Sequence, residues 1–136
     1  MMTNQLSPDL FRVIDANLNR LKEGIRVVED ILRYRDNNKE LSSKLKNLRH
    51  LCQVKETTQL LKYRDTANDV LRSSIKSELN RSGIQSIILA NFKRAQESSR
   101  VLEELYKLHS EEYSENFKYI RYELYSIEKE VIVESK

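Results

Sequence analysis

Two stretches of the chain align without a gap and decide its fold: IDANLNRLKEGIRVVEDILRY at residues 14–34 and ILANFKRAQESSRVLEELYKL at residues 88–108. Eight aligned positions carry the same residue: Ile14/Ile88, Ala16/Ala90, Asn17/Asn91, Arg20/Arg94, Glu23/Glu97, Arg26/Arg100, Val27/Val101 and Glu29/Glu103. Behind them, LSSKLKNLRHLCQ at residues 41–53 aligns on YSENFKYIRYELY at residues 113–125, which repeats Ser42/Ser114, Lys46/Lys118 and Arg49/Arg121. The sequence therefore predicts one helix–turn–helix unit that occurs twice.

Each of the four segments has the apolar spacing of an amphipathic helix. In the first, apolar residues follow one another at steps of four and three, which places them on one side of a helix. They are Ile14, Leu18, Leu21, Ile25, Val28 and Leu32. The other stripes are Leu41, Leu45, Leu48 and Cys52; Ile88, Phe92, Ala95, Ser99, Leu102 and Tyr106; and Tyr113, Phe117, Ile120, Leu124, Ile127 and Val131. Ser7 and Pro8 predict the start of the first helix, and the polar cluster at 36–38 predicts its end.

Short turns between the two helices of a hairpin make them antiparallel neighbours. We therefore predict an all-α fold, an antiparallel helical bundle built from a duplicated helix-turn-helix hairpin with a helical or loop linker between the repeats. The expected organisation is a single helical domain over residues 1–136. Repeat one covers about residues 9–57, the linker 58–82, and repeat two about 83–131.

The composition excludes several classes of protein. The 136 residues hold two glycines and one proline, whereas average usage would give about 16 of the two together. No glycine-rich phosphate loop is present, and turn residues are too few for an all-β fold. The 24 basic residues are balanced by 21 acidic ones interspersed with them, which excludes a nucleic-acid partner. The single cysteine, with no visible signal peptide and no long apolar run, predicts a cytoplasmic protein without a membrane partner.

The repeated polar residues allow two interpretations. Ala16, Arg20, Glu23 and Val27 lie opposite the apolar stripe of their helix, and all four recur in the second copy. Either this face also packs, against the other repeat or against another subunit of a homo-oligomer, or it lines a polar cavity between the repeats. Gly24 adds that something comes close to this helix, because a glycine in a helix interior costs roughly 0.5–1 kcal/mol relative to alanine.

The linker carries a second group of polar residues, YRDTANDV at residues 63–70. One interpretation is a capped turn, with Asp65 or Thr66 at the start of a short helix through Leu71, Ile75 and Leu79. The other is a phosphate loop. In that case Arg64 binds phosphate oxygens, while Asp65 and Asp69 hold a Mg²⁺ ion that keeps most of its waters.

Five segments together resemble a known family. They are IDANLNRLKEGIRVVED, LKNLRH, RDTANDV, ANFKRAQESSRVLEEL and FKYIRYELYSIEK, within residues 11–130. They are similar to the helical hydroxymethylpyrimidine-phosphate kinase family, usually found as the N-terminal domain of bifunctional thiamine-phosphate synthases. The resemblance implies an enzyme of thiamine biosynthesis that transfers the γ-phosphate of ATP, with Mg²⁺, to hydroxymethylpyrimidine phosphate and forms the diphosphate. It also makes thiamine-phosphate synthase an expected partner.

A kinase without a glycine-rich loop must bind phosphates with side chains, chiefly arginines. We expect Glu23, Glu97 and Asp65 to be the catalytic residues, and Asp65 and Asp69 the metal ligands. The expected substrate- and phosphate-binding residues are Asn17, Arg20, Arg26, Arg49, Arg64, Thr66, Asn91, Arg94, Arg100 and Arg121.

The alternative function is a non-catalytic oligomerisation or regulatory module associated with thiamine-phosphate synthase. Four of the seven tyrosines, Tyr113, Tyr119, Tyr122 and Tyr125, lie in the last helical segment. Tyrosine is enriched at protein–protein interfaces, although ordinary core and rim packing would also account for these residues.

Overall fold

The computed structural model describes residues 6–75 and 81–134, and within these ranges it is all-α, without a strand. The long helices are α1 (Pro8–Asp30), α2 (Lys39–Leu51), α5 (Ile84–Tyr106) and α6 (Glu111–Lys129). A short helix, α3 (Thr57–Lys62), follows α2. Single π-helical turns, η1 (Ile31–Arg35) and η2 (Glu130–Glu134), extend the ends of α1 and α6. None of the helices in these ranges is both long and apolar enough to cross a membrane.

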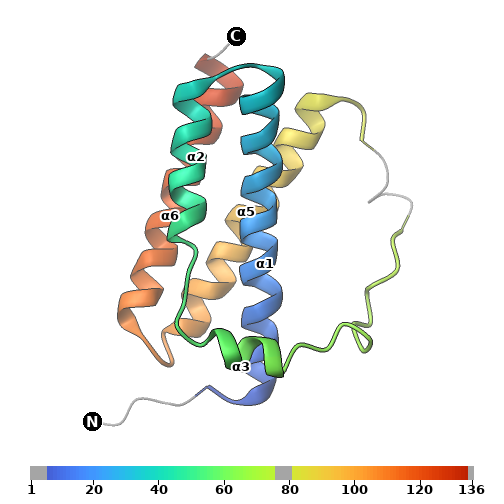
Figure 1. The fold of residues 1–136 in the computed structure, drawn as a ribbon, viewed down its shortest axis with the longest axis vertical. Coiled ribbons are helices and arrows are strands. Elements are labelled where there is room, and N and C mark those ends of the chain that lie inside the picture. The colour runs from blue at the N-terminus through green and yellow to red at the C-terminus, as the bar shows by residue number, and fades with distance from the viewer. Residues whose placement is uncertain (1–5, 76–80, 135–136) are drawn as a thin grey trace.

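The long helices form an antiparallel bundle (Figure 1). α1 packs against α2 on one side and against α5 on the other, and α6 closes the bundle by packing on α5 and α2. In Figure 1, α3 lies across the lower end of α1, and residues 63–75 then run outside the bundle. The predicted all-α antiparallel bundle is thus confirmed.

The predicted apolar stripes form the core. Every residue of the first three stripes is buried, and so are all members of the fourth except Tyr113, which is partly buried. The predicted start of the first helix is also confirmed, with Ser7 as N-cap and Pro8 as the first helical residue. Asn37 has a positive φ of 52° and turns the chain, and the Asn38 side chain accepts a hydrogen bond from the Leu41 backbone N–H at 3.0 Å to begin α2.

Gly24 marks the closest approach of α1 to α5. A Cβ atom at this position would lie 3.0 Å from the Asn91 carbonyl oxygen and 3.3 Å from the Ala95 Cβ. Both neighbours belong to α5, so the glycine allows the two helices to cross at short range. The predicted close approach is confirmed, and its partner is a helix of the same chain.

The segment from Lys55 to Tyr63, which includes α3, is attached to the bundle at both ends. The Phe11 ring of α1 stacks on Tyr63, with ring centroids 6.1 Å apart. On the other side, the Tyr106 hydroxyl donates a hydrogen bond to Glu56 Oε1 at 2.8 Å, and the Tyr113 hydroxyl accepts one from the Lys55 backbone N–H at 3.1 Å. These contacts hold α3 across the end of the bundle.

The short helix expected downstream of Asp65 is wrong for the described part of the linker. Residues 66–75 form turns and bends, and the helical turn of this region, α3, ends before them at Lys62. Leu79, the last residue of the expected helix, lies outside the described residues. The Asp65 side chain instead caps a turn, because it accepts hydrogen bonds from the Asn68 backbone and side chain.

Candidate functional site

Two cavities meet between α1, α5 and the linker, and we call them together the linker site. The first, of about 520 Å³, lies between α1 and residues 64–69. The second, of about 580 Å³, lies between α1, α5 and the later part of the linker. Asn17, Arg20 and Asp69 line both, so the two cavities are neighbours along α1.

The linker site brings together eight of the predicted site residues from three separate segments of the chain. They are Asn17 and Arg20 of α1, Arg64, Asp65, Thr66 and Asp69 of the linker, and Arg94 and Glu97 of α5. The antiparallel packing of α1 on α5 places the aligned arginines Arg20 and Arg94 on the walls of one cavity. Neither arginine has an ion-pair partner within residues 6–75 and 81–134, so both guanidinium groups remain available for an anion.

An ion pair fastens the linker to α1. Arg64 donates from Nε and Nη2 to the two carboxylate oxygens of Asp15, both at 2.7 Å. Asp15 is only 6% exposed, and its hydrogen bonds raise the pKa of Arg64. Arg12 adds a hydrogen bond from Nη2 to the Asp65 carbonyl oxygen at 3.1 Å. The Arg64 guanidinium keeps further N–H donors for a ligand, since a guanidinium carries five.

The linker carboxylates fit a partly hydrated Mg²⁺ ion rather than a closed metal site. The two Asp65 oxygens accept hydrogen bonds from Asn68, which lower the pKa of Asp65, with a smaller contribution from Arg12. Asp69 Oδ1 accepts from the Leu71 backbone N–H at 3.0 Å. In the described ranges, no cluster of three or more His, Cys, Asp or Glu side chains could hold a metal. Mg²⁺ bound to phosphates needs only one or two protein carboxylates, which is what Asp65 and Asp69 offer.

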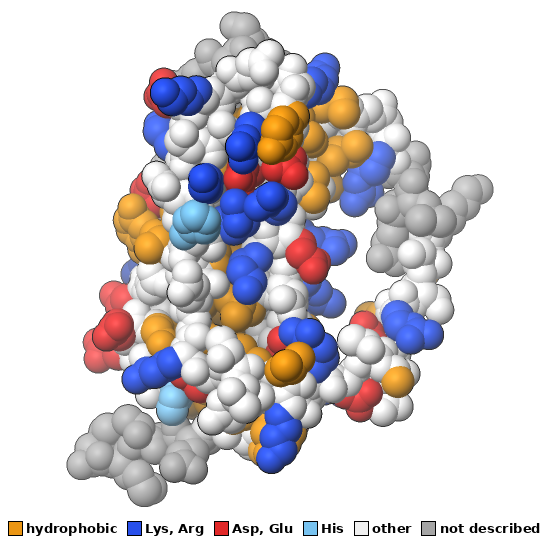
Figure 2. All heavy atoms as spheres, viewed as in Figure 1, with side chains coloured by type: hydrophobic (Ala, Val, Ile, Leu, Met, Phe, Trp, Pro, Cys, Tyr) orange, Lys and Arg blue, Asp and Glu red, His pale blue; other side chains and the backbone are white. Residues whose placement is uncertain are grey.

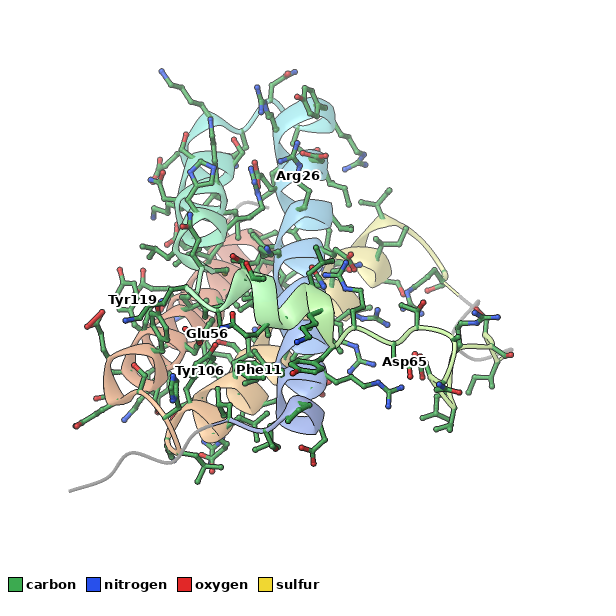
Figure 3. All side chains as sticks on the ribbon, turned by 60° about the horizontal axis from the view of Figure 1, so that its bottom comes forward. Phe11, Arg26, Glu56, Asp65, Tyr106 and Tyr119 are labelled. Atoms are coloured by element: carbon green, nitrogen blue, oxygen red, sulfur yellow. The ribbon has the colours of Figure 1, made fainter. Side chains whose placement is uncertain are left out.

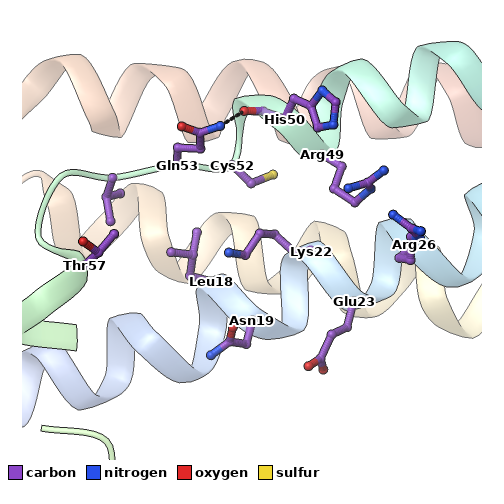
Figure 4. Close-up of a pocket in the computed structure, with 11 residues that line it drawn as sticks. Leu18, Asn19, Lys22, Glu23, Arg26, Arg49, His50, Cys52, Gln53 and Thr57 are labelled. Carbon is purple, nitrogen blue, oxygen red and sulfur yellow. Dashed lines mark hydrogen bonds between the residues drawn. The ribbon is translucent and has the colours of Figure 1, made fainter. Parts of the chain in front are cut away.

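A separate cavity of about 600 Å³ lies between α1, α2 and the segment that follows α2, and we call it the α1–α2 cavity (Figure 4). It contains three other predicted site residues, Glu23, Arg26 and Arg49. Figure 3 shows Arg26 and Asp65 well apart, since Arg26 lies near one end of the bundle and Asp65 on the linker beside α3. These predicted residues are therefore divided between two cavities, and Asn91, Arg100 and Arg121 line neither.

Arg49 and Arg121, at aligned positions, form equivalent buried ion pairs. Arg49 donates from Nε and Nη2 to the Glu29 carboxylate at 2.7 and 3.0 Å. Arg121 donates from the same two atoms to Glu103 Oε1 at 3.3 and 3.0 Å. Both carboxylates are almost completely buried, so each pair joins the two helices of one hairpin.

Asn91 and Arg100 line neither the linker site nor the α1–α2 cavity. The Asn91 amide donates to the Ile87 carbonyl oxygen of its own helix at 2.8 Å, and Arg100 pairs with Glu104 at 3.4 Å on the surface of α5. Cys52, on the floor of the α1–α2 cavity, is fully buried, and burial raises its pKa to about 12. Its thiol is therefore protonated at neutral pH and is a poor nucleophile.

Comparison with known proteins identifies the family of the chain. A model of the ThiD2 family matches residues 12–130. The chain belongs to the ThiD2 family. It is similar to proteins named thiamine-phosphate synthase: 38% identical over 125 residues in Nostoc sp. (strain PCC 7120), 37% over 126 in Synechocystis sp. (strain PCC 6803), and 36% over 135 in Rhodopirellula baltica. These matches support a role in thiamine biosynthesis.

The ThiD2 chain spans little more than a third of the length of these relatives. The alignments cover 91%, 91% and 96% of this chain but only 36%, 37% and 36% of the relatives, in the same order. No solved structure matches.

Two residues of these cavities were not predicted, because neither is repeated in the second copy. Asp15, which holds Arg64, aligns with Leu89, and Lys22, which lines the α1–α2 cavity, aligns with Gln96. A difference between the two copies could have identified both, because each is charged and the aligned residue of the second copy is not.

Proposed function

We propose that this chain phosphorylates hydroxymethylpyrimidine phosphate to the diphosphate, with ATP and Mg²⁺, in the linker site. The observation that carries the proposal is the meeting of Arg20, Arg94 and Arg64 with two linker carboxylates around one pair of cavities. Membership of the ThiD2 family and the similarity to thiamine-phosphate synthases support the same pathway.

The chemistry of phosphoryl transfer explains why such a site needs little else. The transition state spreads negative charge over the transferred group, and catalysis comes mainly from positioning and positive charge. Bound ATP would supply the phosphoryl group. In our proposal Arg20 and Arg94 bind phosphate oxygens, and Asp65 and Asp69 hold Mg²⁺ through carboxylate oxygens and waters.

Glu97 and Asn17 complete the proposed site. Glu97 lines the same cavity as Arg94. The nucleophile would be a phosphate oxygen of hydroxymethylpyrimidine phosphate, which attacks the γ-phosphorus of ATP while ADP leaves. In our proposal the Glu97 carboxylate takes up the proton of the monoprotonated substrate phosphate as a general base. Glu23, its aligned counterpart, lines the α1–α2 cavity instead, so we propose no role for it in proton transfer. Asn17, which already donates to the Val13 carbonyl at 2.9 Å, offers its amide oxygen to the substrate.

A direct assay with matched variants tests this proposal. Purified protein is incubated with Mg-ATP and hydroxymethylpyrimidine phosphate, and the diphosphate is measured. Arg64→Ala, Asp65→Ala and Arg94→Met should each lower turnover at least about tenfold, or roughly 1.4 kcal/mol. Arg100→Met is the control, because Arg100 is an exposed arginine of the same helix as Arg94 and lines neither cavity. Equal turnover in the linker variants and the control would remove the linker from the site.

The tyrosines of α6 support the alternative, a non-catalytic module that binds thiamine-phosphate synthase. Tyr119 and Tyr122 are 53% and 52% exposed, and the Arg121 guanidinium lies 4.8 Å from the Tyr122 ring centroid. Figure 3 places Tyr119 and Asp65 at opposite sides of the molecule, so such a surface would not use the linker site. Failure to form the diphosphate, together with tight binding to the synthase, would favour the module.

A further inference from the structure

We propose that the α1–α2 cavity is a second ligand site, separate from the linker site, which binds a small organic anion with a flat apolar body. The cavity has a volume of about 600 Å³, within the usual range for small-molecule sites. The proposal concerns binding alone and does not depend on the kinase activity proposed above.

The apolar part of the cavity offers a surface for a flat ring. Leu18 of α1 and Cys52 and Val54 behind α2 line it, and each is less than 8% exposed as a residue. Because the Cys52 thiol is protonated, this wall carries no negative charge that would repel an anion. Because these side chains are already almost completely buried, contact with them removes chiefly the ring's own apolar surface from water, which favours binding by about 25 cal/mol per Å².

Lys22 is the cation that makes the cavity selective for an anion. Figure 4 shows its side chain extending from α1 toward Leu18 and Cys52, whereas Glu23 points away from α2. Lys22 is partly buried and has no ion pair in the described parts of the chain. The charge of Arg49 is matched by Glu29, so Arg49 adds little net charge to the cavity. Lys22 is left to bind a negatively charged group.

The surroundings of the cavity strengthen its attraction for anions. Figure 2 shows Lys and Arg side chains gathered over α1 and α2 on this face. Arg26 and His50 lie at the rim, where Arg26 shares its charge with Asp30 at 3.4 Å. The Gln53 amide, which donates to the His50 carbonyl at 2.8 Å, adds a polar wall. Glu23 also lines the cavity but points away from α2, so the charge that attracts an anion between α1 and α2 is that of Lys22.

The second hairpin differs from the first at several residues that line this cavity. Its aligned residues are bulkier or already paired: Tyr122 and Tyr125 stand where the first hairpin has His50 and Gln53. At the position of Lys22 stands Gln96, whose amide donates to Glu128 at 2.9 Å. The second hairpin therefore has a paired neutral amide at this position, whereas the first hairpin has Lys22 in a cavity.

The test compares four small molecules that carry a flat ring, an anionic group or both. AMP joins a flat ring to a phosphate, adenosine lacks the phosphate, inorganic phosphate lacks the ring, and nicotinate carries a carboxylate in place of the phosphate. Binding of each is measured by isothermal titration calorimetry. We expect AMP or nicotinate to bind more tightly than adenosine and inorganic phosphate, and the stronger of the two identifies the preferred anion.

Variants then locate the binding. Lys22→Gln and Gln53→Tyr introduce the residues of the second hairpin, the first removing the charge and the second filling the cavity. Each should weaken binding of the preferred probe at least tenfold. Lys129→Gln, the same change on the exposed end of α6, should leave the affinity as it is, and so should Arg94→Met in the linker site. Circular dichroism checks that each variant is folded.

Three outcomes would overturn the proposal. One is that none of the four probes binds to the folded protein at about 1 mM. Another is that the affinity of the preferred probe is the same in Lys22→Gln and in the parent chain. The third is that Arg94→Met abolishes binding while Lys22→Gln does not, because the probe would then occupy the linker site.

Discussion

Replacing Gly24 by alanine should destabilise the protein, although the same change stabilises most helices. Two terms oppose each other. Alanine is the better helix former in a helix interior by roughly 0.5–1 kcal/mol. The added Cβ, however, would meet the Asn91 carbonyl oxygen at 3.0 Å and the Ala95 Cβ at 3.3 Å. Neither atom can rotate away, so α1 and α5 must separate.

The magnitude follows from the difference between these terms. Overpacking a close-packed contact costs typically about 1–3 kcal/mol, and a backbone carbonyl as neighbour places this contact in the upper half of that range. We therefore expect Gly24→Ala to lower the free energy of unfolding by about 1–2 kcal/mol, which for a chain of this length lowers the melting temperature by about 3–8 °C. Separation of α1 from α5 would also widen the linker site.

Urea unfolding followed by circular dichroism measures this change, and Ala16→Gly supplies the control. Ala16 is an exposed residue of the same helix, so its replacement measures the alanine–glycine preference of α1 without a contact to α5. If Gly24→Ala stabilises the protein by as much as Ala16→Gly destabilises it, the close approach of the two helices would be refuted.

Two further predictions concern buried ionisable groups. Glu103→Gln leaves the buried Arg121 without its charged partner and should lower the free energy of unfolding by about 3 kcal/mol. Removal of Glu104, whose ion pairs are exposed, should lower it much less, and equal losses in urea unfolding would contradict this. Burial raises the pKa of Cys52 to about 12, and it also raises the pKa of Tyr106. Both side chains therefore bind their protons more tightly in the folded than in the unfolded protein. The free energy of unfolding should therefore fall as pH rises above about 9. Cys52→Ala should make this fall less steep, by up to about 1.4 kcal/mol per pH unit between about pH 9 and 12. The measurement is urea unfolding at several pH values, and the same pH dependence in the variant and the parent chain would contradict the prediction.

The elements that could be predicted are those that local physics decides. The apolar stripes, the Ser7–Pro8 start and the turn at 36–38 depend on spacing and capping within a few residues, and the structure confirms them. The structure of the linker was not predicted, because it depends on contacts with residues that are distant in the sequence. Asp65 can begin a helix or cap a turn, and its contacts with Asn68 and Arg12 decide for the turn only once the linker lies against α1.

The sequence did not predict how the candidate site residues are divided between two cavities. Arg49 was expected at a phosphate, and the sequence has no sign that Glu29, twenty residues earlier, holds it at 2.7 Å. Such a contact depends on how α2 returns along α1, which helical periodicity does not specify. The division of Glu23 from Glu97 has the same origin, because two faces of α1 open into different cavities.

Whether two aligned residues of the hairpins meet depends on their distance from the crossing of α1 and α5. Close to that crossing, the equivalent residues Arg20 and Arg94 meet in one cavity, because antiparallel packing brings the same position of each helix to the same place. Farther away, Glu29 and Glu103 cannot meet, and each binds an arginine of its own hairpin.

Repetition therefore identifies two kinds of residue that the sequence alone does not separate: those that build each hairpin and those that form a shared site between them. The residues that give one hairpin a property of its own must be sought where the copies differ. Asp15 against Leu89 attaches the linker to α1, and Lys22 against Gln96 leaves a cation in an open cavity. Substituting the second hairpin's residue at these two positions is thus a more specific test of function than substituting any repeated arginine.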